Sequence, residues 1–519
     1  MRKHLIRSKK ARYATVTLLL TVMVLVVTLL FNAVFSSLAE RYLWYVDLNG
    51  EETYEVTEDC YALLQDALDN AKSITGKTAS VRLIFCDLKD NLMADDVTRF
   101  LYTTATSIAD RFDEISIENY DIITNPTTVK QYTSTLDPIT GETITTGLVN
   151  TSVIVVAEDY HRVYELADFY VFADEDSADT LWAYKGERKL ASAILRAVDP
   201  EEHIVCLTSN HGEVFSDYEL LYLLDDAGYT ILYMDLYKDP IPENCEMIVS
   251  YNPNTDLVAD GVSSLSELVI LDNFLATEGH SFLVFLESGT PQLPNFERYL
   301  KGWGVSTAYS APNAAGVSHR YMIRDTERSL TSDGYTILAD FASNAVANQL
   351  ADRMNKQVIF KSATGLKIAE EGYKDNRDGS FSSFDGKRTV YPMYQSGSTS
   401  LAWANGNVVD DGNVMMMSLT EQTNAKGSSF VGVIGSVDFS SAKFLQSAVY
   451  GNSDALMHLC EKVGREITPA GLTIKPFAST DISMITTAQM LRWTLALALT
   501  PAVIITALAA WVLIKRRRA

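Results

Sequence analysis

The sequence predicts an α/β protein whose large extracytoplasmic region lies between two transmembrane helices. Three observations support this fold class: strand-like and helix-like segments alternate from residue 57 onward, each end holds a long uncharged apolar segment, and 47% of the 519 residues are hydrophobic. A chain of this length and composition forms more than one ordinary core. We therefore expect two successive α/β domains, the second with a doubly wound, mainly parallel sheet.

The uncharged segments predict transmembrane helices at residues 14–35 and 491–514. Each is long enough to cross a hydrocarbon core of ~30 Å as a helix. Lys and Arg residues flank each segment on its terminal side, and the positive-inside rule then places both tails, residues 1–13 and 515–519, in the cytoplasm. The cell membrane is the predicted location, with the central region outside the cytoplasm.

The first apolar segment has an alternative interpretation as a cleaved signal peptide, because Ser37-Leu38-Ala39 resembles a small-residue cleavage site. Its apolar core exceeds the roughly 7 to 15 residues of a signal sequence. We therefore favour an uncleaved anchor that contacts membrane lipid.

The charge of the central region is strongly negative. Ten of the 43 Lys and Arg residues lie in the two tails, which hold none of the 66 acidic residues, so the remainder carries about −33. A solvated surface accounts for such a charge, and attraction of cationic partners or divalent ions is the alternative. The charge argues against nucleic acid as a partner.

The first predicted α/β domain covers residues 40–200 and opens with alternating helices and strands. A helix, a buried strand, a second helix and a half-buried strand are expected at 57–68, 80–88, 94–112 and 115–122. A hairpin and further strands follow within 136–166, and a helix at 186–198 closes the domain.

The second predicted domain covers residues 201–465 and repeats the strand and helix alternation. Strands are expected at 203–208, 230–235, 246–250 and 281–286, a strand and turn at 428–439, and helices at 215–227, 264–277, 294–301 and 453–464. Residues 305–425 are rich in Ser, Thr, Asn and Gly and are predicted to be an irregular insertion, with an exposed loop at 373–388. Residues 466–490 form the predicted juxtamembrane segment.

The best candidate site is the loop Asn210-His211-Gly212-Glu213, which follows the predicted strand 203–208. Open α/β sheets bind ligands at the carboxyl ends of their strands, so the four residues are candidate ligand-binding residues. Catalysis would also require a nucleophile or a metal beside the histidine.

A structural interpretation of the same loop is the favoured alternative. Asn210 or Ser216 would cap the next helix, Glu213 would lie near its positive N-terminus, and Gly212 would permit a tight turn. The loop would then only begin a helix.

Motifs with specific chemistry are missing from the sequence. It contains no G-x-S-x-G, no H-E-x-x-H, no C-x-x-C and no Walker-type phosphate loop, and its five cysteines are an odd number. The segment 374–385 resembles a calcium loop, but Lys374 at its first position and Asp385 at its last are poor ligands. We therefore predict no catalytic residue, metal or cofactor.

Several short motifs occur along the chain in an order that resembles that of a known family. They are Gly186-Glu187, His211-Gly212-Glu213, Gly228-Tyr229, Asp235-Leu236, Ile241-Pro242, Pro253, then Gly435, Asp438, Phe439, Gly451, Asn452 and Asp454. Their order is similar to that of the GldG-like auxiliary proteins of ABC-type transport systems, named for a gliding-motility component. Asn210 stands where that family usually has glycine.

The resemblance implies a non-catalytic auxiliary subunit that works beside an ABC permease and a separate cytoplasmic ATPase, in transport or in gliding-like motility. Its acidic ectodomain would bind a substrate, a component of the bacterial cell envelope or a partner subunit. The alternative is a membrane-anchored envelope hydrolase that uses His211 and Glu213. A receptor-like sensor is disfavoured because the tails are too short for a signalling domain.

Overall fold

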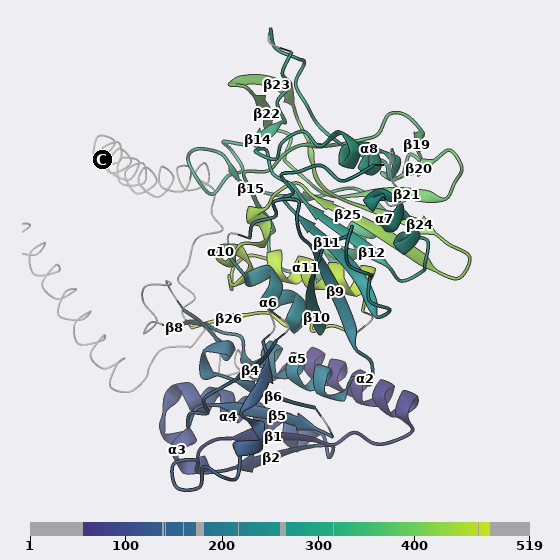
Figure 1. Cartoon of the computed structure of the whole chain (residues 1–519). Helices are drawn as coiled ribbons and strands as arrows, with labels where there is room; N and C mark the ends of the chain where they lie inside the picture. The colour runs from purple at the N-terminus through teal and green to yellow at the C-terminus, as the bar shows by residue number, and fades with distance from the viewer. Residues whose placement is uncertain are drawn as a thin grey trace, which may run out of the picture. The chain divides into compact units, whose positions relative to one another are not determined.

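The computed structural model describes residues 55–477 and Arg492, without residues 138–139, 141, 159, 173–180, 216, 260–265, 315 and 466. The chain is an α/β protein, as predicted, and its elements are drawn in Figure 1. Within this described part, every helix is too short or too polar to span a bilayer. The predicted spans, 14–35 and 491–514, lie outside the described residues apart from Arg492.

The first sheet has four strands in the order β2-β1-β5-β6. Its strands are β1 (Val81–Phe85), β2 (Ile115–Asn119), β5 (Val153–Ala157) and β6 (Tyr160–Tyr164). β1 and β2 are parallel, and α3 (Lys89–Ala94) and α4 (Asp96–Arg111) connect them, so the expected strand, helix, strand unit is confirmed.

The remaining elements of this region surround the first sheet. They are α2 (Glu58–Thr75), η2 (Lys130–Tyr132), the hairpin β3 (Ser134–Leu136) and β4 (Thr143–Thr145), η3 (Leu166–Phe169), β7 (Tyr170–Phe172), β8 (Leu181–Tyr184) and α5 (Gly186–Val198). β8 also pairs with β26 (Lys475–Pro476) from the end of the described chain. Side-chain caps define two helix starts, because Thr57 accepts from the Cys60 amide and Asp95 from the Val97 and Thr98 amides.

The second sheet is mixed, with the main strand order β10-β9-β11-β12-β25-β24-β21-β20-β19. Its parallel half consists of β9 (His203–Thr208), β10 (Tyr229–Met234), β11 (Cys245–Tyr251), β12 (Ser281–Phe285) and β25 (Ser428–Ile434). The helices of this region are α6 (Glu219–Asp226), α7 (Glu267–Leu275), α8 (Pro294–Gly302), α9 (Ala345–Arg353), α10 (Ala442–Leu445) and α11 (Asn452–Val463), with η4 (Asp438–Ser440). Each parallel strand begins within one residue of its predicted start, and β25 occupies the first part of the strand and turn expected at 428–439.

The segment 305–425 is more regular than predicted, and it makes the second sheet mixed rather than mainly parallel. It holds β13 (Val305–Thr307), β14 (Met322–Arg324), β15 (Thr336–Leu338), β16 (Asp340–Phe341), β17 (Ile359–Lys361), β18 (Leu366–Ile368), β19 (Tyr373–Asp375), β20 (Phe381–Ser383), β21 (Arg388–Gln395), β22 (Leu401–Ala404), β23 (Asn407–Asp411) and β24 (Met415–Thr423). The prediction of a loop at 373–388 is wrong, because β19 and β20 pair there as a hairpin. Most of these strands are too short and polar to show an alternating pattern.

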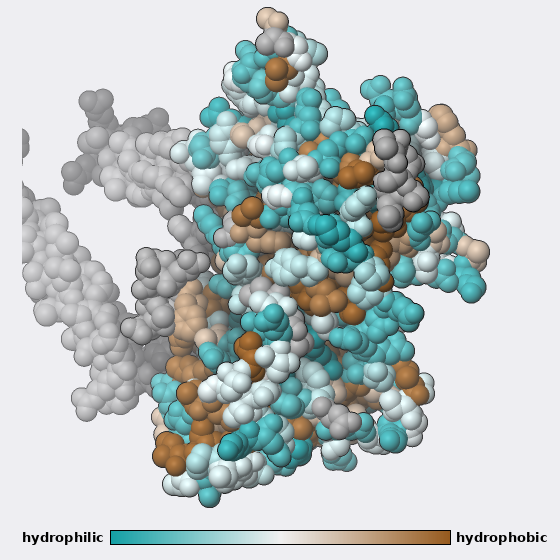
Figure 2. Space-filling view, in the orientation of Figure 1, coloured by the Kyte–Doolittle hydropathy of each residue, from teal (hydrophilic) through white to brown (hydrophobic). Residues whose placement is uncertain are grey.

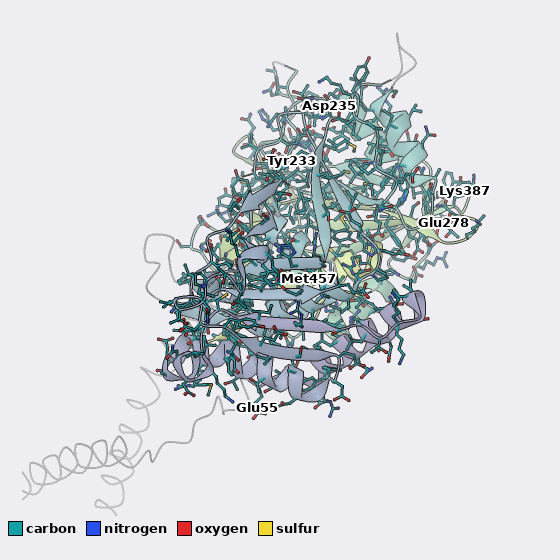
Figure 3. All side chains as sticks on the ribbon, turned by 60° about the horizontal axis from the view of Figure 1, so that its bottom comes forward. Glu55, Tyr233, Asp235, Glu278, Lys387 and Met457 are labelled. Carbon is teal, nitrogen blue, oxygen red and sulfur yellow. The ribbon has the colours of Figure 1, made fainter. Side chains whose placement is uncertain are left out.

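The parallel strands are buried on both faces, which explains why they read as continuous apolar runs. On β9, Val205 and Leu207 point into one core, which α6 and α11 cover, whereas Ile204 and Cys206 point into the opposite core with α7 and α8. Met457 of α11 lies in the first of these cores (Figure 3).

All five cysteines lie in the described part, and each is buried with a free thiol. Burial raises the pKa of Cys86 to about 11 and that of Cys460 to about 12. The folded chain is therefore expected to resist a maleimide at pH 7, and all five thiols should react after unfolding in urea. A Lys426→Cys variant, at an exposed position, is the positive control; rapid modification of native cysteines by mass spectrometry would contradict the burial.

Candidate functional site

The loop after β9 lies where the strand order of the parallel half reverses direction. Numbered along the chain, the five parallel strands have the order 2-1-3-4-5, so β10 flanks β9 on one side and β11 on the other. The connections leave β9 and β11 in opposite directions, which makes their carboxyl ends the topological switch point of the sheet. Residues 210–213 are therefore at the carboxyl edge, where the sequence predicted them.

The backbone of this loop is fixed by the loop that follows β11. The His211 carbonyl accepts from the amides of Asn254 at 2.7 Å and Thr255 at 2.8 Å, and the Gly212 carbonyl accepts from Asn254 Nδ2 at 2.9 Å. Asn210 and Gly212 both have left-handed backbone, with φ of 74° and 78°. The tight turn expected at Gly212 is present.

A Gly212→Ala variant is expected to be destabilised by about 1–2 kcal/mol, because a side chain at φ of 78° is strained and its Cβ would lie 3.2 Å from Asn254 Cβ. Gly147→Ala is the matched control, since nothing lies within 4 Å of the added Cβ. Urea unfolding of the two purified variants measures the difference. Equal stability of both would show that the loop conformation is not constrained.

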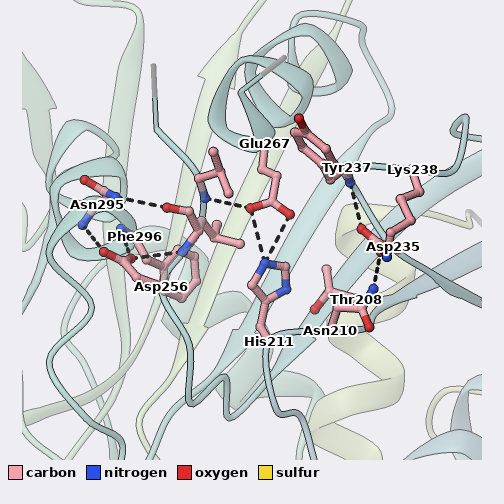
Figure 4. A network of polar contacts seen from close by, with 12 residues as sticks. Thr208, Asn210, His211, Asp235, Tyr237, Lys238, Asp256, Glu267, Asn295 and Phe296 are labelled. Carbon is pink, nitrogen blue, oxygen red and sulfur yellow. Dashed lines mark hydrogen bonds and ion pairs between the residues drawn. The ribbon is translucent and has the colours of Figure 1, made fainter. Parts of the chain in front are cut away.

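His211 is buried between the carboxylates of Glu213 and Glu267, which come from different parts of the chain; Figure 4 shows its contact with Glu267. Its Nε2 lies 3.1 Å from Oε1 of Glu267, in the first turn of α7, and its Nδ1 lies 3.4 Å from Oε1 of Glu213. The three side chains are only 6%, 3% and 4% exposed. Both glutamates have further donors: Val258 N to Glu267 at 2.6 Å, and Thr208 Oγ1 to Glu213 at 2.6 Å.

The electrostatics of this cluster favour a charged histidine. Burial lowers the pKa of His211, but the hydrogen bonds and negative charges of Glu213 and Glu267 outweigh burial and raise it to about 10. Burial likewise raises the pKa of Glu213, and the bonds from His211 and Thr208 reverse this and lower it. At neutral pH the imidazolium has no lone pair to accept a proton, so His211 is unsuited to act as a general base.

Asn210 does not cap a helix, which corrects one of the sequence predictions. Its Nδ2 donates to Asp235 at the carboxyl end of β10, and the same carboxylate binds Lys238 and accepts from the Tyr237 amide at 3.0 Å (Figure 4). The helix α6 begins only at Glu219 and has no side-chain cap. The Glu213 carboxylate accepts instead from Thr208 Oγ1 and from the His211 amide. Ser216, the other predicted cap, is outside the described residues.

Asp256 is a site residue that sequence reasoning missed. Its carboxylate accepts from the amides of Asn295 at 2.9 Å and Phe296 at 3.0 Å, in the first turn of α8. Asn295 Nδ2 also donates to the Leu257 carbonyl at 3.0 Å, as Figure 4 shows. The carboxylate caps a helix about 40 residues away, and no local sequence signal indicates such a partner.

The residues of the calcium-like segment bind their own hairpin. Asp378 accepts from Ser380 N at 3.0 Å, Asp385 accepts from Ser383 Oγ at 2.6 Å, and Asn376 donates to Ser382 Oγ at 2.8 Å. In the described part of the chain, no group of three or more His, Cys, Asp or Glu side chains has a geometry that could hold a metal ion.

The start of α5 is the second feature that sequence reasoning missed. Glu187 is 2% exposed, and its Oε1 accepts from Thr57 N at 2.7 Å and Thr57 Oγ1 at 2.6 Å, while its Oε2 pairs with Lys475 Nζ. Gly186 is required beside it, because a Cβ would lie 2.2 Å from the Tyr184 ring. The charged residues Glu187, Arg188 and Lys189 of this helix are buried together with its apolar face.

A buried ionic cluster connects α5 and β6 with α6. Asp225 receives both terminal nitrogens of Arg162, at 2.7 and 2.8 Å, and lies 3.3 Å from Arg196 Nη1. Lys189 pairs with Asp226 and lies 3.9 Å from Asp225. Burial raises the pKa of Asp225, but the charges of Arg162 and Lys189 outweigh burial and lower it to about 2.

Asn452, from the last motif of the family resemblance, also has a structural role. It is fully buried, and its Oδ1 accepts from Ile359 N at 2.9 Å while its Nδ2 donates to the carbonyls of Ile359 at 2.8 Å and Phe439 at 3.0 Å. The side-chain amide of Asn452 therefore links α11 to β17 and to η4. Burial raises the pKa of the neighbouring Asp454.

Comparison with known proteins does not show the family of this chain. No protein-family model matches the chain, and no curated protein matches it. A solved structure described as "mmIFT52 N-terminal domain" is similar at 14% identity over 50% of this chain and 96% of that one, with a TM-score of 0.33. At that TM-score the similarity supports no inference about function, and the resemblance to the GldG-like family remains a hypothesis.

Proposed function

We propose that this protein is a non-catalytic, membrane-anchored auxiliary subunit of an ABC-type transport or gliding-motility-like system. Two α/β ectodomains, meeting near residues 199–200, lie outside the cytoplasm between helices at 14–35 and 491–514. The acidic ectodomain region binds a substrate, an envelope component or a partner subunit. An ABC permease and a separate cytoplasmic ATPase are the proposed partners.

Two uncharged segments, each flanked by Lys and Arg on its terminal side, are the observation that supports the proposed membrane anchoring. Two such anchors, one on each side of the ectodomain, suit a protein held beside a permease. The order of the sequence motifs supports the choice of the ABC-type system.

The chemistry of the switch-point loop supports a role without catalysis. His211, its only titratable base near neutral pH, is 6% exposed and held between Glu213 and Glu267, and hydrogen bonds raise its pKa to about 10. A hydrolase would require this histidine to accept a proton from water or from a nucleophile. The rival function therefore has less support than a binding role.

The proposal is tested by isolating the full chain from native membranes in detergent through a C-terminal affinity tag, followed by mass spectrometry. Recovery of one polytopic permease together with a Walker-motif ATPase is the expected result. Recovery of the chain alone, from membranes in which such partners are expressed, would refute the auxiliary role.

A further inference from the structure

A cleft of about 700 Å³ opens at the carboxyl ends of β1 and β2 in the first sheet. Apolar side chains form most of its wall, among them Leu92, Val97, Leu166, Tyr170 and Phe172. Asp87, which directly follows Cys86 at the end of β1, lies among the polar lining residues. Among the described residues that line the cleft, none is Lys, Arg or His.

Asp87 places an uncompensated negative charge in this cleft. The residue is 7% exposed, and its Oδ1 accepts from Leu88 N and Asn91 Nδ2, both at 2.7 Å. Its Oδ2 has one long contact, 3.3 Å from Asn150 Nδ2, and no cation pairs with it among the described residues. A carboxylate oxygen accepts two hydrogen bonds, so Oδ2 retains capacity for a charged donor.

The rim of the cleft is apolar and open to solvent. Ile123 lines the cleft and is 78% exposed, and nearby Leu88 and Met93 are 48% and 38% exposed. In Figure 2, brown surface gathers at the lower left, around the position of α3. Leu88 and Met93 adjoin the lining residues Asp87 and Leu92 in sequence, so three exposed apolar side chains belong to the segments that form the cleft.

The cleft also lies next to the point where the described chain ends. Tyr170 lines the cleft, and its ring stacks on Phe477 with centroids 6.1 Å apart and an interplanar angle of 18°. Residues 478–490 separate Phe477 from the predicted second transmembrane helix, and fully extended they would span at most about 45 Å. A membrane-embedded partner is therefore within reach of this face.

We propose that the cleft docks an extracytoplasmic loop of the permease in which an Arg or Lys is flanked by apolar residues. The cation would reach Asp87 Oδ2, and the apolar neighbours would cover Ile123, Leu88 and Met93. The charge of the central region, about −33, favours a cationic protein segment over an anionic lipid surface or a second copy of this chain. The assignment depends on the auxiliary role proposed above, since it names the partner of that role.

Photo-crosslinking from Ile123 tests this assignment in the full chain. A benzophenone amino acid replaces Ile123, native membranes are irradiated, and the tagged chain is purified for mass spectrometry. The expected product joins Ile123 to a loop of the co-purifying permease that has Lys or Arg among apolar residues. The same probe at Phe384, which is 71% exposed in the turn between β20 and β21, is the control and should give no such product.

Two variants then separate the charge from the apolar contact. Asp87→Asn keeps the shape and the bonds from Leu88 and Asn91 but removes the charge, and it should lower the yield of the product at least tenfold. Asp352→Asn, at an exposed position of α9, should leave the yield unchanged. If circular dichroism shows that Asp87→Asn does not fold, the Met93→Ser variant at the exposed rim tests the docking surface in its place. It is expected to lower the yield of the crosslinked product severalfold.

Several outcomes would overturn the docking surface. They are a product with lipid or with a second copy of this chain, equal yields from Ile123 and Phe384, or an unchanged yield in a folded Asp87→Asn variant. If permease and ATPase co-purify but Ile123 crosslinks to neither, the surface is refuted and the auxiliary role stands. If neither partner co-purifies, the auxiliary role itself fails.

Discussion

Asp225→Ala is expected to lower the free energy of unfolding by about 3–5 kcal/mol, because Arg162 is then buried without its carboxylate partner and Lys189 keeps only Asp226. The two side chains are 10% and 8% exposed, so water cannot replace Asp225. Urea unfolding of the purified full chain in detergent, followed by far-ultraviolet circular dichroism, measures the loss. Asp352→Ala, an exposed carboxylate on α9, should change stability by less than about 0.5 kcal/mol.

The pairing of Asp225 with Arg162 is tested separately by a double-mutant cycle with Arg162→Met. A coupling energy near zero would contradict the bidentate contact. The same carboxylate gives a dependence on pH, because its folded pKa of about 2 lies below the ordinary value of 3.8. Its stabilisation is present above pH 3.8 and is lost as the pH falls through about 2.

His211→Ala is expected to destabilise the fold by ~3 kcal/mol, because Glu213 and Glu267 then face each other in a buried site without a cation between them. The folded pKa of about 10 lies above the ordinary value of 6.5. The stabilisation by the charged histidine is therefore complete below pH 6.5 and disappears as the pH rises through about 10.

Unfolding measured from pH 6 to pH 10 checks this dependence. His203, whose pKa burial lowers but Asp199 and Glu246 raise to about 9, loses stabilisation over a similar range, so only the difference between wild type and His211→Ala reports on His211. His319→Ala, outside this cluster, is the control. A difference that stays constant up to pH 10 would show that the imidazole is neutral in the folded state.

The parallel half of the second sheet was predictable because its strands repeat one simple pattern. Continuous apolar runs such as residues 203–208 occur only where both faces of a strand are buried, and the helices between them follow the 3.6-residue period. The hairpin of β19 and β20 has three residues in each strand, and its polar composition gives no such signal.

The candidate site was predictable in position but not in chemistry. The end of β9 identified the carboxyl edge, yet the partner of His211 is Glu267, 56 residues further along the chain. A charged run such as Glu187, Arg188 and Lys189 usually marks a solvated face of a helix. Here the partners that bury it come from α2, α6 and the end of the described chain, and only the tertiary structure brings them together.

Glu187 joins the two ends of the described chain at a single carboxylate. Thr57 near the beginning of the described chain and Lys475 near its end bind opposite oxygens of the same carboxylate. A force applied to the chain near Thr57 or near Lys475 would therefore act on the same point, the first turn of α5. Two residues later Lys189 pairs with Asp226 of α6, so α5 connects both ends of the described chain to a helix that packs on the second sheet.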